Sequence, residues 1–198
     1  SYRNVTDYGG NPNRELVGFT ESTTPEFVKD RIRDNILEGA IFTEFDQLPS
    51  SELMQLRENM LETLTSDSWT IDGLADQLEQ LPGVDLDNAR TIARTETASV
   101  LNSAREDSYK EQGDDDGLFY WSGAAPGDNR QTEACEYLIE ETNPNYGGHP
   151  VPLDELKQMI KDVPKQDKVT DVQVGTPRPD NFVVHPNERS TFIKAPGT

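Results

Sequence analysis

The segment from Leu86 to Gln112 predicts one long helix, and this helix limits how the rest of the chain can fold. At about 100° per residue, a single stripe of small and apolar side chains runs along it. The stripe consists of Ala89, Ile92, Ala93, Val100 and Ala104, with Glu96 among them. Small side chains let a neighbouring backbone approach closely. Because an unpaired buried charge is costly, we expect Glu96 to be either buried with a partner or partly exposed at an edge.

Three shorter amphipathic helices are predicted upstream, because apolar residues recur there at steps of three and four. The first begins with a hydroxyl, a proline and an acid at 24–26, and the other two begin near residues 50 and 71. Their apolar stripes contain Val28, Ile32, Ile36, Leu53, Leu56, Met60, Leu64, Ile71, Leu74, Leu78 and Leu81. Residues 1–23 show little periodicity, so we expect an extended N-terminal arm before a helical region at 24–112.

After the long helix the chain changes to short strands, turns and short helices. Residues 118–122 are rich in aromatic side chains and predict a strand. Residues 182–184 and 191–193 predict two further strands on either side of a bend. Between the first of these strands and the second we expect two helices. One has Asp128 as its N-cap, and the other lies around Leu156.

A polar, proline-bearing loop is predicted at about 163–181. Within it, a short strand or an exposed hairpin is expected from Val169, Val172 and Val174. The predicted fold class is therefore α+β. A helical stem is followed at 113–198 by a small α+β lobe with a short antiparallel sheet.

The charge balance of the chain is extreme. It carries 37 Asp and Glu against 18 Lys and Arg, a formal net charge of -19, and the acids are spread along the sequence rather than collected in a tail. Hydrophobic residues make up 33% of the chain, so we expect a thin core. Like charges at this density destabilise a compact state in dilute salt. The composition favours a protein from a halophile, with an ordinary acidic protein as the alternative.

These two alternatives predict different melting behaviour. For a halophile protein, Tm should rise steadily from dilute buffer to molar KCl, because the Debye length falls to about 3 Å at 1 M salt and self-repulsion is screened. Thermal unfolding followed by circular dichroism measures this dependence. A Tm that is already high in dilute buffer and does not respond to KCl would favour the ordinary acidic protein.

Three short motifs occur in order along the chain: Ala93-Arg94-Thr95-Glu96, the run from Trp121 through Asp128 and Arg130 to Cys135, and His185-Pro186-Asn187-Glu188-Arg189-Ser190. In that order they resemble the phage Mu F-like head morphogenesis proteins, which are minor capsid proteins of tailed viruses. The resemblance covers roughly residues 88 to 193 and skips two long loops. It implies a structural motif that includes Glu96, Trp121, Asp128, Arg130, Cys135, His185, Pro186, Asn187 and Arg189. It also leads us to predict a structural ion pair from Glu96 to Arg130 or Arg189.

The four cysteine positions of that family are filled differently in this chain. Thr132 and Cys135 stand where the family has a Cys-x-x-Cys pair, and Glu188 and Ser190 replace the cysteines of the last motif. A four-thiolate zinc site needs sulfur at all four corners, so it cannot form here. We expect packing and hydrogen bonds to hold the lobe, with no metal and no cofactor.

Few residue patterns in the chain point to catalysis. Neither a Gly-x-Ser-x-Gly elbow nor a phosphate-binding Gly-Lys-Ser/Thr loop occurs. A mixed metal site from Cys135, His149, His185 and Glu188 requires that their loops converge, and a histidine beside proline is more often a structural residue. We therefore expect no catalytic residue and no enzyme. The alternative is a metal-dependent or nucleophilic hydrolase on the C-terminal lobe, with His185, Cys135 and a carboxylate in an open pocket.

The overall acidity argues against sequence-specific DNA recognition, which relies on a basic surface. The nearest approach to a basic patch is Lys157, Lys161, Lys165 and Lys168. These lysines form either a solvated helix face or a contact with packaged DNA or an acidic neighbour. The chain has no run of 18 apolar residues, so we expect no membrane contact.

Together, the resemblance and the composition imply a structural minor head protein of a tailed virus of a halophilic archaeon. Family membership implies a place at the portal or inner capsid, contact with the portal protein or the major capsid protein, and a role in head assembly and DNA packaging or release. Such a protein is found in the virion head, and in the host cytoplasm during assembly. A capsid decoration or adaptor protein is a further alternative.

Overall fold

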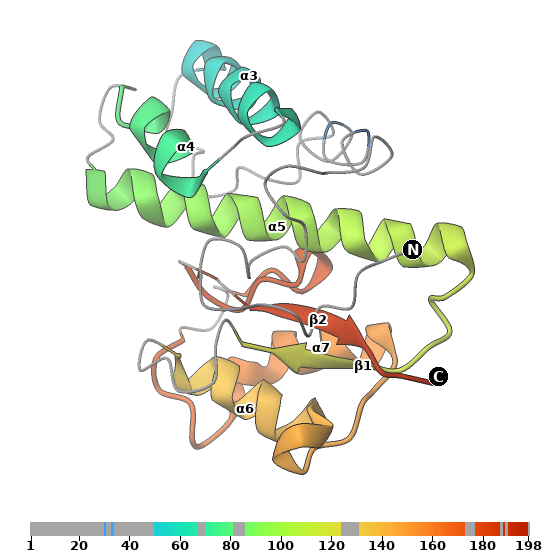
Figure 1. Ribbon diagram of the computed structural model, residues 1–198. Coiled ribbons are helices and arrows are strands. Elements are labelled where there is room, and N and C mark those ends of the chain that lie inside the picture. Colours follow the sequence, from blue (N-terminus) through green and yellow to red (C-terminus); the bar gives the residue numbers. More distant parts are fainter. Residues whose placement is uncertain are drawn as a thin grey trace.

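The computed structural model describes residues 30, 33, 50–66, 70–80, 86–123, 131–172, 177–186, 188 and 190–197. The predicted arm at 1–23 and helix start at 24–26 lie outside these residues. In the described part the fold is α+β and mostly helical, as predicted. Helices α3 (Ser50–Thr65) and α4 (Ile71–Leu78) lie on one side of α5 (Leu86–Gln112), and the small lobe lies on the other (Figure 1).

Helix α5 is covered from both sides in its central part. Every residue from Thr95 to Glu106 is buried, which is more than the single stripe predicted from periodicity. Helix α4 packs along one side, and the short 3-10 helix η5 (Pro179–Asn181) and strand β2 (Thr191–Lys194) contact it from the lobe. Many of its central side chains are small, which lets elements approach from both sides. They include Ala93, Thr97, Ala98, Ser99, Ser103 and Ala104.

The sheet of the lobe joins two segments that are far apart in sequence. Strand β1 (Phe119–Ser122) pairs antiparallel with β2, with Trp121 opposite Phe192. This pairing confirms the predicted strands at 118–122 and 191–193. Because a two-stranded sheet is marginal by itself, its stability has to come from the elements packed on it.

On the edge of β1 that does not face β2, backbone N–H and C=O groups form hydrogen bonds with a neighbouring loop and with side chains. Phe119 and Val151 exchange backbone hydrogen bonds at 2.7 and 2.8 Å. The backbone N–H of Trp121 donates to Oγ1 of Thr142 at 2.8 Å, and Nδ2 of Asn143 donates to the Trp121 carbonyl at 3.1 Å. These groups take the place of a third strand, and they tie β1 to the end of helix α6 (Glu133–Thr142).

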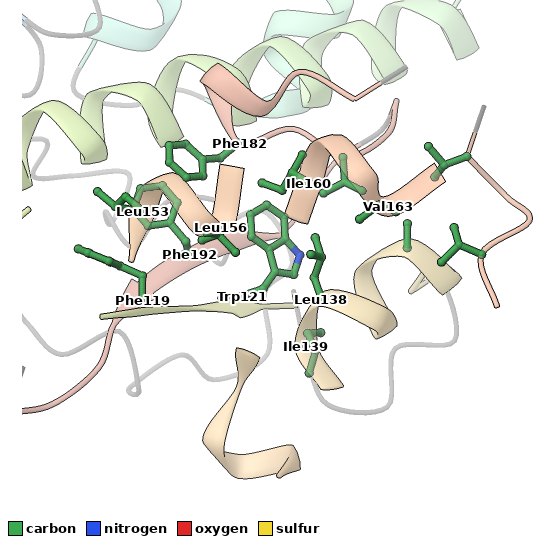
Figure 2. Packing of buried hydrophobic residues seen from close by; sticks show 14 residues of the cluster. Phe119, Trp121, Leu138, Ile139, Leu153, Leu156, Ile160, Val163, Phe182 and Phe192 are labelled. Atoms are coloured by element: carbon green, nitrogen blue, oxygen red, sulfur yellow. The ribbon is translucent and has the colours of Figure 1, made fainter. Parts of the chain in front are cut away.

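The core of the lobe is built around aromatic rings (Figure 2). Phe119, Trp121, Phe182 and Phe192 are all completely buried. The rings of Phe119 and Phe192 meet edge to face with centroids 5.8 Å apart, and Tyr109 from α5 packs on Phe119 at 5.0 Å. Helix α7 (Leu153–Asp162) covers this core with Leu153, Leu156 and Ile160.

Three local expectations are corrected by the structure. Val169 and Val172 are buried in the core of the lobe and lie outside any strand, so the predicted short strand or exposed hairpin is wrong for these two residues. Val174 lies outside the described residues. Residues 182–184 form only an isolated bridge, between Val183 and Arg178, because Phe182 has a left-handed backbone with φ of 52° that interrupts an extended strand.

The third correction concerns the start of α6. Its N-cap is Thr132, whose Oγ1 accepts a hydrogen bond from the Cys135 backbone N–H at 3.3 Å, and Asp128 is not the cap. The cap must lie directly before the first helical turn to reach its free N–H groups, and Asp128 is too far upstream. Among the described helices, none is long and apolar enough to cross a membrane.

Candidate functional site: a buried cluster around Cys135

Helix α6 positions the chain's single cysteine at the edge of the lobe core. Cys135 lies in the first turn of the helix, directly after the Thr132 cap, and is 2% exposed. Its neighbours Ala134 and Leu138 pack into the aromatic core. The sulfur is thereby held against the segment that leads into β2.

The bend before β2 brings three polar side chains to that sulfur. Nε2 of His185 lies 3.4 Å from Sγ of Cys135, and Oε1 of Glu188 lies 3.7 Å from it. The Ser190 hydroxyl donates to Sγ at 3.3 Å. We call these four residues, Cys135, His185, Glu188 and Ser190, the Cys135 cluster.

Backbone groups fix the orientation of the cluster. Glu188 is fully buried, and its two oxygens accept hydrogen bonds from the backbone N–H of Val184 at 3.1 Å and of Ser190 at 2.8 Å. Nδ1 of His185 lies 2.6 Å from the Pro186 carbonyl oxygen. A carbonyl only accepts, so Nδ1 carries the proton and the lone pair of Nε2 faces the sulfur when the ring is neutral.

The surroundings of the thiol determine its charge. Burial raises the pKa of Cys135 well above its usual range, and the charge of Glu188 raises it further. The hydrogen bond from the Ser190 hydroxyl acts in the opposite direction but is smaller. The side chain is therefore a protonated thiol at neutral pH, whereas a cysteine nucleophile needs a lowered pKa and access to solvent.

The cluster contains a set of potential metal ligands. The sulfur of Cys135, a ring nitrogen of His185 and a carboxylate oxygen of Glu188 all lie within 4.8 Å of one another. His149, which we had considered with them, is exposed and is not part of this set. The sequence left open whether Cys135, His149, His185 and Glu188 meet. In the structure three of them do, and His149 does not.

A buried ion pair joins α5 to the lobe. Oε1 of Glu96 accepts from Nη1 of Arg178 at 2.8 Å, and the two side chains are only 1% and 12% exposed. This confirms that Glu96 is buried with a charged partner, but the sequence did not point to Arg178. The predicted partners Arg130 and Arg189 lie outside the described residues, so that part of the prediction is untested.

Asn102 provides a second polar link between α5 and the C-terminal segment. Its Nδ2 donates to the Phe182 carbonyl at 2.9 Å and to the Ser190 carbonyl at 3.4 Å. Its Oδ1 accepts from the Thr191 hydroxyl at 2.7 Å. The sequence analysis missed this residue. The signal that could have identified it is an amide side chain in the middle of a helical stretch rich in small residues.

The remaining predicted motif residues fall into two groups. Trp121 is part of the lobe core, and Pro186 is exposed beside the Cys135 cluster. Asp128 and Asn187 lie outside the described residues, so no role is assigned to them from the structure.

Most of the predicted lysine patch is paired with acids. Lys157 contacts Glu106 at 2.8 Å, Lys165 contacts Asp162, and Lys168 contacts Glu140 at 2.7 Å. A surface groove of about 560 Å³ is lined by three of the lysines, together with two acids and other residues. The charged residues of its lining are Lys157, Lys161, Lys165, Asp154 and Asp180.

Comparison of the chain with protein-family models, with curated proteins and with solved structures finds no match in any of the three.

Proposed function

We propose that this chain is a structural minor head protein of a tailed virus, acting at the portal or inner capsid in head assembly and in DNA packaging or release. One observation carries the proposal. Thr132, Cys135, Glu188 and Ser190, which stand at the four cysteine positions of the Mu F-like pattern, lie together in space. Thr132 caps the turn that holds Cys135, and the other two lie within 3.7 Å of its sulfur.

This convergence supports the resemblance because chance matches would not produce it. The two halves of the set are far apart in sequence, since Cys135 and Glu188 are separated by 53 positions. Two unrelated short motifs have no physical reason to pack against each other around one atom. The pairing of β1 with β2, which joins the Trp121 motif to the C-terminal motif, supports the same arrangement.

The interior of the chain suits a structural role. The thiol is buried and protonated, and Glu188 is committed to two backbone hydrogen bonds. These properties hold the bend in place and keep the Cys135 thiol and the Glu188 carboxylate away from solvent. The acidic composition suits the molar salt of a halophilic host, and assembly would occur in the host cytoplasm before the protein enters the head.

In the part of the chain that the structure describes, contact with packaged DNA would involve the lysine groove. Lys161 has the most freedom to meet a phosphate, because Lys157, Lys165 and Lys168 each contact a carboxylate. Lys168 is not among the residues that line the groove. We therefore propose that the main partners are the portal protein or the major capsid protein, with at most a minor electrostatic contact to DNA.

A nucleophilic hydrolase is the second candidate, since Sγ of Cys135 lies 3.4 Å from Nε2 of His185. A cysteine and a histidine at this distance are typical of cysteine nucleophiles. The raised pKa of Cys135 and its burial oppose this role. We therefore favour the structural function.

Quantitative mass spectrometry of purified virus particles tests the proposal. We expect peptides of this chain inside the head at a copy number near that of the portal protein and far below that of the major capsid protein. A copy number close to that of the major capsid protein would instead indicate a decoration protein. Absence from washed particles would overturn the structural function.

A further inference from the structure

The three potential ligands of the Cys135 cluster lie close to the separations of a tetrahedral metal site. Zinc bonds of about 2.3 Å to sulfur and about 2.0–2.2 Å to nitrogen and oxygen, at tetrahedral angles, place the ligand atoms roughly 3.4–3.6 Å apart. Here Sγ of Cys135 lies 3.4 Å from Nε2 of His185 and 3.7 Å from Oε1 of Glu188. Nε2 contacts Glu188 through the other carboxylate oxygen, Oε2, at 3.9 Å. With one oxygen counted for the carboxylate, the three ligand atoms lie within 4.8 Å of one another. A rotation of the Glu188 carboxylate and movements of up to about 1 Å would bring them to zinc-bond distances.

The backbone groups that hydrogen-bond to His185 and Glu188 hold these side chains as ligands are held in metal centres. A ligating histidine usually donates its other ring N–H to a carbonyl or carboxylate, which fixes its tautomer. Nδ1 of His185 donates in this way to the Pro186 carbonyl at 2.6 Å. Ligating carboxylates are likewise held by hydrogen bonds, and Glu188 accepts from two backbone N–H groups.

We propose that Cys135, His185 and Glu188 bind one divalent ion of the zinc type. The Ser190 hydroxyl, 3.3 Å from the sulfur, or a water molecule would occupy the fourth position. This set differs from the four-thiolate site of the family that the chain resembles, since His185 is not at one of those cysteine positions. It revises our expectation from the sequence that the lobe holds no metal.

Charge and ligand type select this class of ion. On binding, the Cys135 thiol loses its proton to solvent and forms a thiolate–metal bond. One thiolate, one carboxylate and a neutral imidazole around a divalent cation give a site with no net charge, which suits a buried position. Calcium and magnesium prefer sites built from oxygen ligands alone, whereas a sulfur, nitrogen and oxygen set favours zinc or cobalt.

The bound ion would link two parts of the lobe. Cys135 comes from α6, and the other two ligands come from the bend before β2. The His185 side chain is 14% exposed while Glu188 is fully buried, so the ion would enter from the His185 side or during folding. A bound ion should therefore raise the stability of the lobe.

Cobalt titration of the full chain tests this inference. The protein is unfolded in denaturant in the presence of a chelator and refolded in molar KCl without metal. It is then titrated with Co²⁺. We expect one equivalent to produce a thiolate-to-cobalt charge-transfer band, displacement of cobalt by Zn²⁺, and a Tm that rises by several degrees with either ion. No band and no change in Tm at millimolar Co²⁺ would overturn the inference and leave a hydrogen-bonded cluster without metal.

Variants locate the site. Cys135→Ser should abolish the charge-transfer band, and His185→Gln should weaken cobalt binding by about tenfold or more. His149→Gln is the matched control, because it removes the chain's other histidine, which is exposed, and it should bind cobalt as the wild type does. Equal loss of binding in the His149 and His185 variants would also overturn the inference. Where a variant fails to fold, the wild-type titration still decides, and neither result depends on the copy number in virus particles.

Discussion

Replacing Trp121 by alanine should lower the free energy of unfolding by about 3–5 kcal/mol. The indole is completely buried among Leu138, Leu156 and Ile160 in the core of the lobe (Figure 2). Removing it deletes the largest side chain of that core and leaves a cavity between the sheet and the helices α6 and α7. Because whole domains are stable by only about 5–15 kcal/mol, this loss would remove much of the stability of the fold.

Denaturant unfolding in molar KCl, followed by circular dichroism, measures the Trp121→Ala effect. Tyr146→Ala is a suitable control, since Tyr146 is also a large aromatic residue of the lobe but is 56% exposed. The control should change the unfolding midpoint very little. If both variants unfold at the wild-type denaturant concentration, the burial of Trp121 in the core of the lobe does not stabilise the protein.

Replacing Glu96 by glutamine should destabilise the protein by about 3 kcal/mol. The carboxylate is 1% exposed and bonds Arg178 at 2.8 Å, across 82 positions of sequence. Glutamine keeps the size and part of the hydrogen bonding but removes the negative charge. The guanidinium of Arg178, only 12% exposed, would then be buried with less compensation for the loss of its hydration.

An exposed ion pair provides the control for Glu96→Gln. Glu140 and Lys168 lie 2.7 Å apart with both side chains more than half exposed, and such pairs contribute little. Glu140→Gln should therefore unfold at nearly the wild-type denaturant concentration, with both variants compared in the same KCl concentration. Wild-type stability of Glu96→Gln would show that the buried pair does not hold α5 to the lobe.

Local periodicity in the sequence correctly predicted the α-helices in the described part of the chain, but it did not predict 3-10 helices such as η5. Steps of three and four apolar residues marked α3, α4, α5 and α7, because one buried face of a helix repeats at that spacing. The aromatic run at Phe119–Trp121 likewise marked β1. These features depend on neighbours in sequence, and that is why they could be predicted.

The errors arose where long-range contacts override local preference. Val169 and Val172, which with Val174 predicted a short strand or an exposed hairpin, are instead buried in the core of the lobe. The pairing of Glu96 with Arg178 was not predicted, because Arg178 lies in a proline-bearing loop and meets Glu96 through the packing of η5 on α5. The predicted partners Arg130 and Arg189 lie outside the described residues, so that prediction stays untested. Choosing one arginine among several requires coordinates, since any of them has the charge to pair with a carboxylate.

The sequence by itself determined the helical stem, the two strands of the sheet and the acidic character of the chain, since each follows from local pattern or composition. Only the tertiary structure decided that Cys135, His185, Glu188 and Ser190 meet around one sulfur atom. The physical reason is that a side-chain cluster depends on how α6 and the bend before β2 are placed in space. That placement follows from the packing of the aromatic core and from the pairing of Trp121 with Phe192.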